Sequence, residues 1–235
     1  MYIQLTKEPK KPLILQGFPG FGMIGSIVAE YLVSHLDMEK IGSIIVDDLP
    51  PAVPIHEGKI IDPVGIYFSA QYNLIVVHIA VPLANMEWKF ADIMLSLCTR
   101  LDAWELLCVD GLLDEDSSDE TVVSYYSTHA GAQDKLGSTG IKPLQSGIVV
   151  GAAGSLLLRG HVRLTAFFAT THSDFPDSIA AAGIIRALDA YLGLQIDPQP
   201  LLDTAAVFEE KVRAMLSNSA QTLDEKEKKQ LSYVG

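Results

Sequence analysis

The chain has 235 residues, 49% of them hydrophobic, which is enough for one large domain with a substantial buried core. Its net charge of −12 excludes the basic surface that nucleic-acid binding requires. No apolar run reaches the ~18 residues of a transmembrane helix, and the charged first residues lack the apolar region of a signal peptide. We therefore expect a cytoplasmic protein that contacts neither membrane nor nucleic acid.

The predicted elements alternate between strand and helix along most of the chain. An apolar run at 13–16 indicates a buried strand, and a helical pattern over 23–36 follows the glycine-rich turn GFPGFG. Further strand-length runs alternate little, as in strands covered on both faces, and lie at 43–47, 64–69, 73–81, 105–109, 147–150 and 165–170. Other helical patterns lie at 87–101, 155–159 and 179–192. This order predicts a three-layer α/β/α domain with a mostly parallel sheet.

The composition divides the chain into a domain at 1–195 and a helical extension with a polar tail at 196–235. Within the domain, residues 48–62 and 110–128 are predicted to be irregular excursions. The segment 110–120 carries six acids and no base, which is typical of a solvated loop. After a proline-containing linker, an amphipathic helix is expected over 201–217, followed by a polar tail.

The first glycine turn is a candidate ligand site. Gly17, Gly20 and Gly22 could bring backbone N–H groups to an anion at a helix N-terminus. Their spacing does not match G-x-G-x-x-G, and no P-loop lysine follows. The turn is therefore interpreted as a closely packed strand–helix turn, a partner-recognition surface or an anion site.

A second turn, at 147–160, has similar composition. Gly151, Gly154 and Ser155 could hold an anion, with Ser155 capping a helix. If both turns lie at the carboxyl ends of neighbouring strands, they flank one crevice. Close packing is the alternative interpretation.

The evidence for catalysis is sparse. His56 and Glu57 are adjacent, but neighbouring side chains usually point apart, and no third ligand is suitably spaced. No G-x-S-x-G nucleophile elbow is present. Cys98 and Cys108 fit no metal spacing and are interpreted as small buried hydrophobic residues. We therefore expect no catalytic residue, metal or cofactor.

Several strings in order resemble the proteasome assembly chaperone family, specifically the archaeal homologues of the second eukaryotic assembly chaperone. The resemblance spans about residues 12–210 and rests on GFPGFGMIGSIVAEYLV, IHEGKI, PVGIY, NLIVVHIAVP, GIVVGAAGSLLL and DSIAAAGIIRAL. It implies a fold related to nucleoside phosphorylases and hydrolases. It also implies self-association into small homo-oligomers and a role in assembling proteasome α-subunits.

In that family, a C-terminal tail ending in a hydrophobic residue, tyrosine and any residue can dock between α-subunits. Here the tail offers Leu231, Tyr233, Val234 and Gly235, so the tyrosine lies one residue farther from the carboxylate. Two hypotheses follow. The first is a non-enzymatic assembly chaperone that binds proteasome α-subunits as a homo-oligomer. The alternative is a phosphorylase- or hydrolase-like enzyme that binds a nucleoside or other anionic small molecule at the glycine turns.

Overall fold

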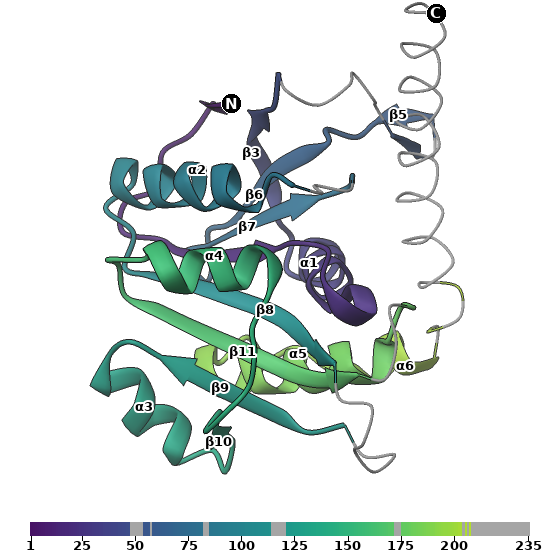
Figure 1. The fold of residues 1–235 in the computed structure, drawn as a ribbon. Coiled ribbons are helices and arrows are strands. Elements are labelled where there is room, and N and C mark those ends of the chain that lie inside the picture. Colours follow the sequence, from purple (N-terminus) through teal and green to yellow (C-terminus); the bar gives the residue numbers. More distant parts are fainter. Residues whose placement is uncertain are drawn as a thin grey trace, which may run out of the picture.

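A computed structural model gives the fold (Figure 1) and describes residues 1–47, 54–56, 58–81, 85–113, 121–171, 175–203, 205 and 207. Its centre is a nine-stranded sheet. In spatial order the strands are β1 (Tyr2–Leu5), β3 (Glu39–Ile45), β6 (Val64–Ser69), β7 (Leu74–Ile79), β2 (Leu13–Gly17), β8 (Glu105–Leu113), β11 (Leu164–Thr171), β9 (Val123–Ser127) and β10 (Lys142–Pro143). Strands β4 (Ile55–His56) and β5 (Lys59–Ile60) form a separate small hairpin.

The sheet is mixed, with parallel pairing among its four central strands and between the edge strands β9 and β10. Strands β7, β2, β8 and β11 form the parallel part, and their residues are buried almost throughout. Strands β6, β3 and β1 extend one side in antiparallel order, and β9 pairs antiparallel with β11 on the other side. The prediction of a mostly parallel sheet is therefore not confirmed for the sheet as a whole: the central strands and the short β9–β10 pair are parallel, and the other pairs are antiparallel.

Helices cover both faces of the sheet, as predicted for three layers (Figure 1). One face packs against α1 (Ile24–His35), α3 (Ala130–Gly137), α5 (Ser178–Leu192) and α6 (Gln199–Asp203). The other face packs against α2 (Glu87–Arg100) and α4 (Gly151–Arg159). The helical pattern predicted over 23–36 matches α1, whose apolar side chains Ile24, Ile27, Val28, Tyr31 and Leu32 are at most 2% exposed. Burial of these side chains holds α1 on the sheet.

The strand order reverses direction between β2 and β8. After β2 the chain passes through α1 and adds β3, β6 and β7 on one side of β2. After β8 it adds β11 on the other side. In open α/β sheets, ligands bind at the carboxyl ends of strands beside such a switch point. Here the switch point lies between the end of β2, with its glycine turn, and the end of β8.

Several elements differ from those predicted. Residues 147–150 do not form a strand but lead into α4, and Ile148 is 84% exposed. The predicted solvated loop begins too early, because β8 continues to Leu113 and buries Asp110. Strands β1 and β9 and helix α3 were not predicted. Of the predicted extension, α6 packs on the main core through the buried Leu201, and residues 208–235 lie outside the described part of the chain.

Candidate functional site

The glycine turn after β2 connects the strand to α1 through a 3-10 turn, Phe21–Met23. A Cβ at Gly17 would overlap the Cβ of Ala29 on α1, so the strand and the helix approach more closely than a larger residue allows. Gly22 has a φ of 61°, in the left-handed region that favours glycine. These contacts agree with the interpretation of a closely packed turn.

The same turn packs against two acidic side chains. A Cβ at the exposed Gly20 would overlap Oδ1 of Asp110, at the end of β8. A Cβ at Gly22 would lie 2.9 Å from Oγ1 of Thr171 and 3.2 Å from Cβ of Asp177. A neighbouring carboxylate repels an anion, so these contacts disfavour an anion beside Gly20.

Asp110 is a buried carboxyl group with few hydrogen bonds. It is 8% exposed, and burial raises its pKa from 3.8 to about 7. The backbone N–H of Gly111 donates to Oδ1 at 2.8 Å and partly opposes this rise. The group therefore changes charge near neutral pH.

Gln16 fixes the two strand ends beside Asp110. Its Nε2 donates to the carbonyl oxygen of Val109 on β8 at 3.2 Å. Its Oε1 accepts the backbone N–H of Phe18 at 3.1 Å. The fully buried amide thus ties the glycine turn to β8 across the switch point.

Asp177 stands at the same edge, but its oxygens have structural partners. Oδ1 accepts the backbone N–H of Ala180 at 2.9 Å and caps α5. Oδ2 accepts the hydroxyl of Thr171 at 2.9 Å, and the backbone N–H of Asp177 donates to the carbonyl oxygen of Gly22 at 2.9 Å. This carboxylate therefore joins α5 to β11 and to the glycine turn.

The second predicted turn forms the first part of α4. Gly151 is its first residue, and a Cβ at Gly154 would lie 2.6 Å from the carbonyl oxygen of Val149. The prediction that Ser155 caps a helix is wrong, because Val150 occupies the cap and Ser155 lies inside α4. The Ser155 hydroxyl lies 3.0 Å from the carbonyl oxygen of Glu87, where it can donate and link α4 to α2.

Two other predicted sites are largely outside the described residues. His56 lies in the β4–β5 hairpin, paired with Lys59, and nothing is described of Glu57. The tail residues Leu231, Tyr233, Val234 and Gly235 are outside the described chain. Their roles stay predictions.

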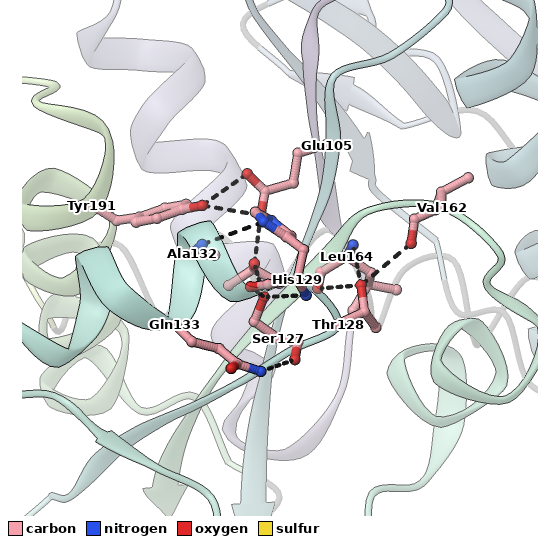
Figure 2. Close-up of polar contacts among 10 residues, drawn as sticks. Glu105, Ser127, Thr128, His129, Ala132, Gln133, Val162, Leu164 and Tyr191 are labelled. Atoms are coloured by element: carbon pink, nitrogen blue, oxygen red, sulfur yellow. Dashed lines mark hydrogen bonds and ion pairs between the residues drawn. The ribbon is translucent and has the colours of Figure 1, made fainter.

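A polar network that was not predicted surrounds Glu105, the first residue of β8 (Figure 2). Glu105 is 3% exposed. The Tyr191 hydroxyl donates to Oε2 at 2.9 Å, and the Thr165 hydroxyl donates to Oε1. His129 Nδ1 accepts the backbone N–H of Ala132 at 3.3 Å, so its proton lies on Nε2, which donates to Oε1 of Glu105 at 2.9 Å.

The Glu105 network joins α3, α5 and β11 to the start of β8. Tyr191 lies on α5, His129 caps α3 and Thr165 lies on β11. Figure 2 shows Tyr191 and His129 pointing toward Glu105. Burial is the larger cause and the negative charge of Glu105 the smaller cause of the raised pKa of Tyr191, so this phenol stays protonated and donates. The network lies at the amino end of β8, opposite the carboxyl edge where α/β sheets bind ligands. We interpret it as a structural support.

The cysteines behave as the small hydrophobic residues that were predicted. Both are buried without a disulfide, and burial raises the pKa of Cys98 to about 12 and that of Cys108 further. No metal-binding group of histidine, cysteine and acidic residues occurs among the described residues. In that same part of the chain, every helix falls short of the length and hydropathy of a transmembrane span.

Comparison with known proteins shows the family. The sequence profile of the PAC2 family matches residues 14–216. The chain belongs to the PAC2 family. This match confirms the family resemblance seen in the sequence. Structures of several similar proteins have been solved.

One similar structure is PbaA of Pyrococcus furiosus, described as an archaeal homolog of proteasome-assembly chaperone. It is 26% identical, with a TM-score of 0.83 over 94% of this chain and 99% of PbaA. Pyrococcus furiosus PbaB, described as an archaeal proteasome activator, has the same fold at 23% identity, with a TM-score of 0.73 over 91% of this chain and 97% of PbaB. An uncharacterised protein of Methanocaldococcus jannaschii is 20% identical over 97% of this chain and 94% of that protein.

Proposed function

We propose that this PAC2 family protein is a non-enzymatic assembly chaperone that binds proteasome α-subunits as a homo-oligomer. The likeness to PbaA carries the proposal, because it extends over 94% of this chain at 26% identity. A cytoplasmic location, as expected from the sequence, is part of the same proposal.

Exposed apolar side chains support a role in protein binding. Ile55 and Ile60 form a cross-strand pair on the β4–β5 hairpin and are 69% and 70% exposed. Phe175, just before α5, and Ile179, in its first turn, are also largely exposed. When a partner covers exposed apolar side chains such as these, the burial of their surface lowers the free energy and favours binding.

The net charge supports a partner with a basic surface. The value of −12 gives the chain a negative field that attracts a positively charged surface and repels other copies of an acidic protein. Self-association therefore requires apolar contacts that outweigh this repulsion. The exposed isoleucine pair is one such surface.

We propose the tail as a second contact. Tyr233, with Leu231 and Val234, supplies an aromatic anchor with apolar neighbours, and such anchors contribute much of the affinity in peptide docking. This role comes from the family resemblance and from the residue types.

The test is size-exclusion chromatography with light scattering of the protein alone and mixed with archaeal proteasome α-subunits. The proposal expects a homo-oligomer alone and a co-eluting complex at micromolar concentration. Separate elution of the two proteins contradicts it. Tyr233→Ala tests the tail against Ser232→Ala as a matched control, and a complex that survives Tyr233→Ala places the contact on the folded domain.

The enzyme alternative rests on the switch point, where Asp110 changes charge near neutral pH beside Gly20. Such a carboxyl group can transfer protons. The relation to nucleoside phosphorylases, and an anionic ligand at Gly17, Gly20 and Gly22 or at Gly151, Gly154 and Ser155, remain part of this alternative. A rise in melting temperature with phosphate or nucleosides would favour it over the chaperone proposal.

A further inference from the structure

The carboxyl group of Asp110 lies where a ligand can approach the switch point. Asp110 lies on β8, three residues before the strand ends at Leu113, and the exposed Gly20 of the facing turn packs directly against its Oδ1. Gly20 has no side chain to cover the carboxyl group. The carboxyl group is thus in direct contact with an exposed segment of backbone at the switch point.

Asp110 has unused hydrogen-bonding capacity. Its Oδ1 accepts one backbone N–H, from Gly111. Its Oδ2 accepts no hydrogen bond from the part of the chain that the structure describes, although the residue is more than nine-tenths buried. By contrast, Glu105 and Asp177 receive donors on both oxygens. Among the described residues, Oδ2 of Asp110 is not one of the fully buried side-chain atoms without a partner, so it keeps some contact with solvent, through which a new donor can reach it.

Asp110 also lacks a cationic partner within the described residues. The ion pairs formed there by lysine and arginine use other acids, namely Glu8, Glu39, Asp62, Asp92 and Asp102. Asp177 adds a second negative charge at the same edge, behind Gly22. Asp177, and Asp110 when it is ionised, favour a cation over an anion in this place.

We propose that Asp110 and the Gly20 turn bind a nitrogen cation, a guanidinium or ammonium group, that donates to Oδ2. Such a group supplies both the missing hydrogen bond and the missing positive charge. Its source is an arginine or lysine side chain of the α-subunit partner or a free amine. The first source rests on the proposed function, and the second does not.

The direct test is calorimetric titration of the full chain with argininamide and with cadaverine. Binding by the wild type and at least tenfold weaker binding by Asp110→Asn is the expected result. Asp102→Asn, which changes an exposed acid in a surface ion pair, is the matched control and should bind as the wild type does. Gly20→Ala should also weaken binding, because its methyl group would overlap Oδ1 of Asp110.

A second measurement does not depend on the variants folding. In NMR spectra of the wild type, the amide signals of Gly20 and Gly111 should shift as either probe is added. Gly20 and Gly111 signals that stay unchanged with both amine probes would overturn the proposal. A shift of the same signals with inorganic phosphate in place of the amines would overturn it as well.

The α-subunit mixture separates the two sources. A complex at least tenfold weaker with Asp110→Asn than with Asp102→Asn assigns the cation to the α-subunit. An unchanged complex together with probe binding assigns it to a free amine. An unchanged complex without probe binding overturns the cation site but leaves the chaperone proposal standing. Probe binding without any α-subunit complex supports the cation site and overturns the chaperone proposal.

Discussion

Strand β8 carries two buried carboxyl groups, Glu105 at its start and Asp110 near its end, in opposite situations. Glu105 receives hydrogen bonds from Tyr191, Thr165 and His129. Within the described residues Asp110 receives one backbone N–H, from Gly111, and burial raises its pKa to about 7. A satisfied carboxylate stabilises the fold, whereas an under-bonded one is available to a ligand. Burial alone therefore does not separate structural from functional acids; the donors around them do.

The largest effect is expected from Glu105→Ala. The substitution removes the carboxylate that accepts from the buried hydroxyls of Tyr191 and Thr165 and from the partly buried His129, and it should lower the free energy of unfolding by about 3–5 kcal/mol. Denaturant unfolding measures the loss. Asp110→Asn should cost less than about 1 kcal/mol at neutral pH, because it removes a poorly bonded group. Equal losses in the two variants would break the distinction.

A slightly smaller effect is expected from pH. Between pH 4 and pH 7 the unfolded chain has released the Asp110 proton, while the folded chain, with its raised pKa, still holds it. The free energy of unfolding should therefore fall as pH rises through this window, by up to about 4 kcal/mol from Asp110, and should level off at higher pH.

The pH effect is isolated by comparing variants. Asp110→Asn should lack this part of the pH dependence, whereas Asp102→Asn, at an exposed acid, should keep it. Unfolding curves at several pH values measure the difference. Parallel pH profiles of Asp110→Asn and the wild type would contradict a raised pKa.

A moderate effect is expected from Tyr191→Phe, which removes one donor and leaves Glu105 with two side-chain partners. The free energy of unfolding should fall by about 1–3 kcal/mol, since the hydrogen bond is to a charged group. Tyr126→Phe, at a half-exposed tyrosine on β9, is the control and should change little. The account fails here if both variants lose the same stability in thermal unfolding.

A smaller effect than that of Tyr191→Phe is expected from Asp177→Ala. Loss of the cap on α5 and of the hydrogen bond from Thr171 should destabilise the protein by about 1 kcal/mol. Probe binding at Asp110 should persist in this variant, although a charge at the same edge is gone. Calorimetry and thermal unfolding of the same sample give both values, and complete loss of binding would show that Asp177 belongs to the site.

Local patterns predicted the central fold well. The apolar run at 13–16, the glycine turn and the buried stripe of α1 are continuous in sequence, so their periodicity was enough to predict β2 and α1. The run at 147–150 was wrongly predicted as a strand, because a short apolar run has no period that separates strand from linker. Strand β9 and helix α3 were missed because the acidic composition of 110–120 led to the prediction of an irregular segment up to residue 128.

The functional residues were harder to predict. Glu105 and His129 lie 24 positions apart, and Tyr191 lies 86 from Glu105, so only folding brings them together. A lone acid at the start of an apolar strand was the available signal. Asp110 was assigned to a solvated loop because five more acids follow it, but pairing with β11 carries it into the sheet.

The most direct test of the functional account is light scattering of the wild-type chain eluting with archaeal proteasome α-subunits, beside the same mixture made with Asp110→Asn. The account predicts a wild-type complex whose mass includes both proteins, weakened at least tenfold in the variant. Two separate peaks for the wild-type mixture, each with the mass of one protein alone, would contradict it.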